Sequence, residues 1–284
     1  MNVQEFSAMS VNLFDLFGYQ FFQYALLGGV IVAVACAIIG LFLILKKEAM
    51  IGDGLAHTAF GGVAVGLLLG VHPLLTALGV SVLAVFAISY MRRKKIAASD
   101  SAIAVMLALG FSTGLIVISL AGGFNVELFS YLFGSILTID IVDLLLVSFL
   151  GLAVLLFVAF FRRELLSMVF DEDDSRIMGI PTKGLSIAFD LLVAVTIVLS
   201  IKVIGTILVV ALLVLPGLCA LKLNLSFRKT LFAAVGFSVL STVLGILFSA
   251  LFDIALAVDI ATSGLIVFVL VMFFLLTLVY KKIG

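Results

Sequence analysis

The feature that most limits the fold of this chain is a near-continuous series of long apolar segments, separated by short polar loops. A helix needs about 20 mostly apolar residues to cross the hydrocarbon core of a bilayer. Hydrophobic residues make up 65% of the chain and charged residues 11%, whereas soluble domains contain roughly half apolar and a quarter charged residues. A single globular core cannot bury this excess, so the sequence predicts a membrane protein.

Nine segments are long enough, or nearly long enough, to span a bilayer. Their predicted ranges are Tyr19–Leu45, Met50–Gly70, Leu74–Tyr90, Ala102–Ala121, Asp140–Phe161, Leu185–Ile201, Gly205–Leu221, Thr230–Leu251 and Ser263–Tyr280. The alternating pattern of a transmembrane β-barrel is absent from the sequence. We therefore predict an all-α polytopic membrane protein, built as a bundle of about 8–9 transmembrane helices. A single domain is expected to cover residues 1–284.

Two stretches outside these segments carry separate expectations. Residues 1–18 contain Glu5 and Asp15 and no basic residue, which is unlike the positive start of a secretory signal. We predict that they form an extracytoplasmic lead. Phe124–Ile139 is too short and too polar to span, and it is predicted to be a half-inserted or external helix.

Lysine and arginine fall in alternate loops, which predicts the orientation of the chain. Fifteen of the sixteen basic residues lie in one set of loops: Lys46, Lys47, Arg92, Arg93, Lys94, Lys95, Arg162, Arg163, Arg176, Lys183, Lys222, Arg228, Lys229, Lys281 and Lys282. The positive-inside rule places these loops in the cytoplasm, with the N-terminus outside and the C-terminus inside the plasma (inner) membrane. Lys202 alone belongs to the outer loops, where we expect it to pair with an acid. Asp190 is expected near the cytoplasmic interface.

The stretch "EAMIGDGLAHTAFGG" places Asp53 and His57 four residues apart in an apolar run. At this spacing two helical side chains share one face, so a carboxylate and an imidazole can meet one ion. These groups suit zinc and other first-row divalent metals. A structural interpretation stays open: Asp53 as a helix N-cap, with His57 bonded to a neighbouring carbonyl.

Four stretches resemble the permease subunits of ABC transporters that import zinc, manganese or iron. They are "KKEAMIGDGLAHTAFGGVAVGLLLG", with the family's GD-x-L-x-H run; "FSYLFGSIL", with Ser135 in place of an acid; "FDEDDSRIMGI", similar to the cytoplasmic coupling loop; and "KVIGTILVVALLVLPGLCA". The resemblance covers nearly the whole chain. It departs at "DIATSG", where the family's proline is missing.

The resemblance implies an ATP-driven importer of a divalent transition metal, with Asp53 and His57 lining the path and contacting the metal. "FSYLFGSIL" favours zinc as the cargo, with manganese or iron as the alternative. The metal is transported, and no permanent cofactor is expected. The implied partners are a second permease copy in a homodimer, two cytoplasmic ATP-binding subunits and an extracytoplasmic metal-binding protein. Lipid surrounds the chain, and nucleic acid is not an expected partner.

Residues 162–184 are predicted to be a cytoplasmic loop that couples the chain to an ATPase. Acids at the start of a short helix are stabilised by its dipole, and Gly179 with Pro181 would end such a helix. The resemblance assigns the contact to Asp171, Glu172, Asp173, Ser175 and Gly179. A solvated acidic turn is the structural alternative.

Two other classes of function fit the sequence less well than an importer subunit. The sequence contains no GxxxxGK[ST] motif, so we expect no ATP hydrolysis by this chain and do not expect an enzyme. An ATPase-independent secondary carrier would place more ionisable groups at mid-membrane. An intramembrane metalloenzyme needs at least three protein ligands, and the chain has two histidines, one of them in a loop.

Overall fold

The computed structural model describes residues 16–120, 134, 139–256 and 260–283, and all the regular structure in these ranges is helical. Eight helices are long and apolar enough to cross a membrane. They are α3 (Gln20–Leu45), α4 (Ile51–Leu69), α5 (Pro73–Arg93), α6 (Ser99–Leu120), α8 (Ile141–Phe160), α11 (Thr182–Ile204), α13 (Phe227–Leu256) and α14 (Thr262–Ile283). The predicted all-α polytopic bundle is confirmed.

Three further helices complete the described chain. The apolar helix α12 (Thr206–Lys222) has 17 residues and contains Pro216, whereas α9 (Arg162–Phe170) and α10 (Glu172–Ile177) are short and polar. Nearly all of the predicted lead (1–18) lies outside the described residues. The same holds for the predicted helix at 124–139, of which only residues 134 and 139 are described.

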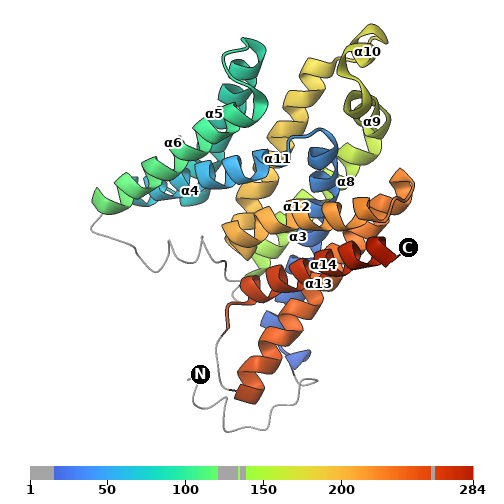
Figure 1. Cartoon of the computed structure of the whole chain (residues 1–284). Coiled ribbons are helices and arrows are strands. Elements are labelled where there is room, and N and C mark those ends of the chain that lie inside the picture. The colour runs from blue at the N-terminus through green and yellow to red at the C-terminus, as the bar shows by residue number, and fades with distance from the viewer. Residues whose placement is uncertain (1–15, 121–133, 135–138, 257–259, 284) are drawn as a thin grey trace.

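The helices form two packed groups joined through the centre of the molecule. Helices α4, α5 and α6 pack together on one side, while α12, α13 and α14 pack against one another and α12 and α13 also pack on α3 (Figure 1). Helix α11 contacts α5 as well as α3, α8 and α12, so it links the two groups. Because α4 lies against both α5 and α6, its position is fixed on two sides.

Close packing at glycine sets how near α4 and α6 approach. A Cβ added at Gly110 of α6 would lie 2.5 Å from Thr58 Cα of α4, and one added at Gly61 would clash with the carbonyl oxygen of Gly110. Small residues at these two positions let the backbones touch, as is usual where lipid supplies no hydrophobic drive for helix association. This contact fixes which face of α4 is turned toward α6.

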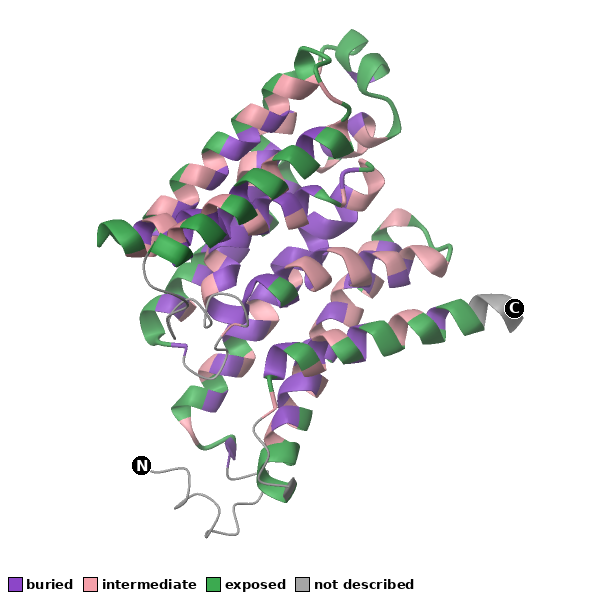
Figure 2. Cartoon of the chain, turned by 60° about the vertical axis from the view of Figure 1, so that its left-hand side comes forward, coloured by how far each residue is buried: buried purple, intermediate pink, exposed green. Residues whose placement is uncertain are grey.

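The burial pattern matches a bundle with lipid as its outer solvent. Buried residues concentrate where the helices meet, and exposed residues cover the outer faces (Figure 2). Many exposed side chains are large and apolar, among them Leu83, Phe149 and Phe232. Such faces are stable against acyl chains and unstable against water.

Helix α11 extends beyond its predicted range and corrects the placement of Lys202. The helix ends at Ile204, and Gly205 (φ 81°) follows it. Lys202 therefore lies in the last turn of α11, and its assignment to an outer loop was wrong. Its Nζ atom forms an ion pair with Asp143 of α8, so the expected pairing with an acid is confirmed. The pair ties the ends of α8 and α11 together.

Candidate metal site and its supporting contacts

Asp53 lies inside the first turn of α4 rather than at its cap. The helix begins at Ile51, and Met50 takes the N-cap position. The alternative interpretation of Asp53 as the N-cap residue is therefore wrong. The first-turn position still suits a carboxylate, since the N-terminal end of a helix carries partial positive charge.

The Asp53 and His57 side chains meet on one face of α4. His57 Nε2 lies 3.4 Å from Asp53 Oδ1, and the two side chains keep 32% and 29% of their surface exposed. Their neighbours in α4 from Ile51 to Ala64 are buried. Between residues 51 and 64, Asp53 and His57 are therefore the two side chains of α4 that remain partly exposed.

Packing against α6 orients the histidine. The ring of Phe111 lies 5.2 Å from the His57 ring at 83°, an edge-to-face contact. His57 Nδ1 is buried and has no hydrogen-bond partner among the described residues. The expected alternative bond from His57 to a backbone carbonyl is not formed there. The other ring nitrogen, Nε2, is the one that faces Asp53.

The separation of these two atoms is suitable for shared metal ligation. Zinc–nitrogen and zinc–oxygen bonds are about 2.1 Å, and two such bonds at a tetrahedral angle place the ligand atoms about 3.4 Å apart. In the described part of the chain, no three His, Cys, Asp or Glu side chains gather into a metal-binding group. One chain therefore offers two ligands at this point.

A hydrogen bond and the glycine contact hold the rotation of α4. Thr58 Oγ1 donates to Gly54 O at 2.6 Å and lies 3.2 Å from Met106 O of α6. Thr58 directly follows His57 in the sequence and is fully buried. Because Thr58 faces the interior, the face of α4 that carries Asp53 and His57 is turned away from the interior. Asp53 and His57 are thus positioned by packing residues that are not themselves metal ligands.

Sequence reasoning missed a buried network of four charges just before α4. Lys46 Nζ lies 2.9 Å from Glu48 Oε2 and 3.4 Å from Asp190 Oδ1, and Arg92 Nη2 pairs with Glu48 Oε1. The side chains of Lys46, Glu48 and Asp190 are at most 9% exposed. Two cations and two anions balance, and they join the ends of α3 and α5 to α11. Asp190, which was expected near the cytoplasmic interface, is buried in this network.

We call the part of the bundle around this network the basic end. It holds the last turns of α3 and α5, the first turns of α11, and the start of α13, where Phe227 contacts Phe42 at 5.6 Å. Lys202 lies at the other end of α11, sixteen residues beyond Ser186, which Lys46 also contacts. At 1.5 Å per residue this is about 24 Å. The single basic residue assigned to the outer side is thus far from the network.

The predicted short acidic helix is present as α10. Asp171 caps it, with Oδ1 accepting from the backbone N–H groups of Asp173 at 2.9 Å and Asp174 at 3.0 Å. Gly179 follows the helix in the left-handed conformation (φ 86°), where glycine is favoured. The segment therefore forms a capped helix whose acids are exposed.

The five residues assigned to coupling differ in what they can touch. Asp171, Glu172, Asp173 and Gly179 are exposed, whereas Ser175 is fully buried. Ser175 Oγ lies 2.7 Å from Ser167 Oγ of α9 and donates to Asp171 O at 2.7 Å, so it joins α10 to α9. The exposed apolar side chains of Phe170, Ile177 and Met178 were not predicted.

Comparison with known proteins gives the relatives of this chain. The ABC 3 transport family (ABC-3) matches residues 18–281. The manganese transport system membrane protein MntC of Halalkalibacterium halodurans is 32% identical over 260 residues, covering 92% of this chain and 89% of that protein. A probable iron transport system membrane protein of Haemophilus influenzae is 29% identical over 93% of this chain and 95% of that protein.

A solved structure shares the fold over nearly the same length. PsaBC from Streptococcus pneumoniae, in complex with Fab, aligns with a TM-score of 0.80 and 29% sequence identity, covering 93% of this chain and 94% of that chain. The helical architecture described above is therefore the architecture of that protein.

Proposed function

We propose that this chain, which belongs to the ABC 3 transport family, carries a divalent transition metal into the cytoplasm. It is a multi-pass permease of a metal ABC transporter in the plasma membrane. The proposed partners are a second copy of the chain, two cytoplasmic ATP-binding subunits and an extracytoplasmic metal-binding protein. Energy comes from ATP hydrolysis in the separate subunits.

The observation that carries the proposal is the Asp53–His57 pair, with candidate ligand atoms 3.4 Å apart on a partly exposed face of the first half of α4. A carboxylate and an imidazole give a dehydrated ion two bonds, which is weak enough for release. The second copy of the chain would supply the same two groups and complete the coordination. Ionisable side chains inside a membrane segment are costly, and those without a paired structural role often mark an ion path.

We propose manganese as the cargo, because the relatives with similar length are named for manganese and iron transport. Zinc is the second candidate, since it is favoured by "FSYLFGSIL". Imidazole with carboxylate suits both ions, and manganese accepts oxygen-rich sites more readily than zinc. The two ions therefore need to be compared directly.

Uptake by the reconstituted complex tests the function and the cargo together. Proteoliposomes that contain the permease, its ATP-binding subunits and the delivering protein are expected to accumulate Mn²⁺ faster than Zn²⁺. This accumulation is expected only when ATP is supplied to the ATP-binding subunits. Accumulation by vesicles that contain the permease alone would instead support a secondary carrier. Faster uptake of Zn²⁺ would assign the cargo to zinc.

We propose that the basic end faces the cytoplasm, with the N-terminus outside and the C-terminus inside. The segment at 162–184, including α9 and α10, then lies on the side where ATP-binding subunits dock. Exposed acids at the start of α10 and the apolar Phe170, Ile177 and Met178 give it a mixed surface that fits a protein groove.

Replacing Asp171 with alanine should weaken coupling to the ATPase. The change removes the cap of a six-residue helix, which costs about 1 kcal/mol, or roughly a fivefold fall in the ratio of ordered to unfolded helix. Metal-stimulated ATP hydrolysis by the complex is therefore expected to fall, by at most about fivefold. Asp171→Asn is the matched control, because asparagine caps equally well and should keep most of the stimulation. Full stimulation in Asp171→Ala would contradict a coupling role for α10.

A further inference from the structure

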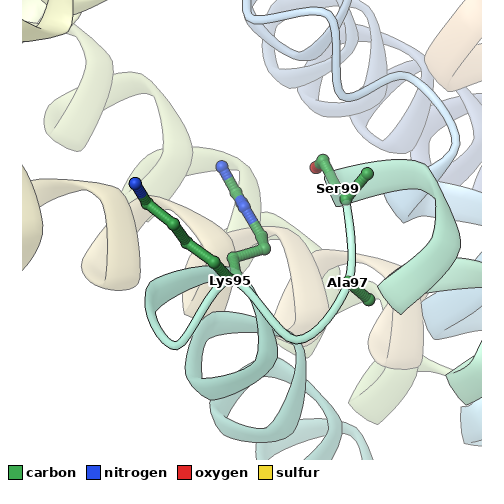
Figure 3. A pocket seen from close by; sticks show the side chains of 5 residues that line it. Lys95, Ala97 and Ser99 are labelled. Atoms are coloured by element: carbon green, nitrogen blue, oxygen red, sulfur yellow. The ribbon is translucent and has the colours of Figure 1, made fainter.

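A surface pocket of about 360 Å³ lies where the chain turns from α5 to α6. Arg92, Lys95, Ala97, Ala98 and Ser99 line it. Figure 3 shows Lys95 and Ser99 on the two sides of this turn, with Ala97 between them along the chain. The small alanine side chains leave the space open, and the polar groups lie at its margins.

The charge around the pocket is positive. Arg92 is already paired with Glu48, and the network of Lys46, Glu48, Arg92 and Asp190 is balanced. The next three residues of the turn, Arg93, Lys94 and Lys95, are exposed, and within the described residues no carboxylate forms an ion pair with them. Asp100 is exposed in the first turn of α6 but is not among the lining residues. The turn therefore carries uncompensated positive charge.

The pocket also offers unused hydrogen-bond donors. Ser99 Oγ is buried and has no partner among the described residues. Ser99 begins α6, and the preceding Ala98 has no side-chain acceptor that could cap the helix. The first N–H groups of a helix lack intrahelical acceptors and lie at the positive end of its dipole. Hydroxyls, free N–H groups and lysines are the groups that bind phosphate anions in proteins.

The surroundings favour a phosphate that carries acyl chains. Further along the two helices that meet at the pocket, α5 exposes Leu83, Phe86 and Tyr90 and α6 exposes Val105 and Leu109. Exposed apolar side chains of this kind suit contact with lipid acyl chains. A phospholipid with its headgroup in the pocket could place its acyl chains along these apolar helix faces. A soluble anion would make no contact with them.

We propose that this pocket binds the phosphate of an anionic phospholipid in the cytoplasmic leaflet, held by Lys95, the Ser99 hydroxyl and the start of α6. Basic pockets at the cytoplasmic side of membrane helices attract anionic headgroups. The lipid would fasten the α5–α6 turn beside the network that precedes α4. The choice of leaflet rests on the orientation proposed above.

Native mass spectrometry of the full chain tests the site. The protein is exchanged into mixed micelles with equal amounts of phosphatidylglycerol and phosphatidylcholine, and the lipids that stay bound are counted. We expect retained phosphatidylglycerol in excess, and a loss of about fivefold in Lys95→Gln, the effect of one basic residue beside an anionic headgroup. Ser99→Ala should lower retention further when added to Lys95→Gln.

Lys229→Gln is the matched control. Lys229 is exposed near the start of α13, at the same basic end, and does not line the pocket, so its loss should leave retention unchanged. Equal loss in both variants, or no loss in Lys95→Gln, overturns the proposal. Displacement of the lipid by millimolar inorganic phosphate would also overturn it in favour of a soluble anion. Lipid retention is measured without any transport step, so the result for the lipid site does not depend on whether the chain imports metal.

Discussion

Metal uptake should fall about 100-fold or more when Asp53 and His57 are both replaced by alanine. The variant removes the only two potential ligands on the open face of α4. Loss of a group that merely supports a ligand already costs 10- to 100-fold in metal affinity, and loss of the ligands themselves is expected to cost at least as much. The measurement is initial Mn²⁺ uptake by proteoliposomes of the complete complex.

Folding must be separated from transport in this experiment. Both side chains are about a third exposed, so alanine should leave no large cavity, and the variant should elute as the wild type does. His72→Ala is the matched control: it removes the only other histidine, which lies in the turn before α5, and should transport normally. Retained uptake in the double variant of a well-folded protein would remove the Asp53–His57 pair from the transport path.

Replacing Glu48 with alanine should destabilise the protein by about 3–5 kcal/mol, the usual cost of breaking a buried ion pair. Glu48 is 4% exposed and holds both Lys46 and Arg92. Without it, Lys46 keeps Asp190 as a partner, but Arg92 loses the one carboxylate with which it forms an ion pair among the described residues. We expect a lower melting temperature and more aggregation in detergent, measured by scanning fluorimetry and size exclusion.

The cause of that loss can be isolated with two further variants. Glu172→Ala removes an acid whose side chain is 54% exposed on α10, and its stability should match the wild type. Glu48→Met with Arg92→Met removes both members of one pair, and it should be more stable than Glu48→Ala because no single charge is left buried. If Glu48→Ala melts like the wild type, the network does not hold the start of α4.

The helices and the juxtaposition of Asp53 with His57 could be predicted because both depend on short-range patterns. A span is visible as a local run of apolar residues, and Asp53 with His57 is visible as an i, i+4 pair. The cap of α10 is likewise local, since Asp171 bonds residues two and three positions on. Such features need no knowledge of which helices are neighbours.

The buried network could not be predicted because its partners are distant in the sequence. Lys46 and Asp190 are 144 positions apart, and Glu48 and Arg92 are 44 apart. Each charge looked like an ordinary residue of a loop or helix end until tertiary packing brought them together. Lys202 was misplaced for the same reason, since a lysine within a helix end is stable when Asp143 of another helix neutralises it.

Ser175 shows the same limit on a smaller scale. The family resemblance implied that it joins its acidic neighbours in contacting an ATPase, and in the structure the side chain lies between α9 and α10 and bonds Ser167. Which face of a six-residue helix is covered depends on the neighbouring helix, and the pattern of six residues does not show it.

Pulsed electron paramagnetic resonance of Mn²⁺ bound to the complex, in the absence of ATP, tests the central claim most directly. An imidazole ligand gives nitrogen modulation in the echo decay, and the chain has only two histidines. The account predicts that the modulation is present in the wild type and in His72→Gln, and that it disappears in His57→Gln. Modulation that survives in His57→Gln, or that is absent from the wild type while Mn²⁺ is bound to this chain, would contradict it.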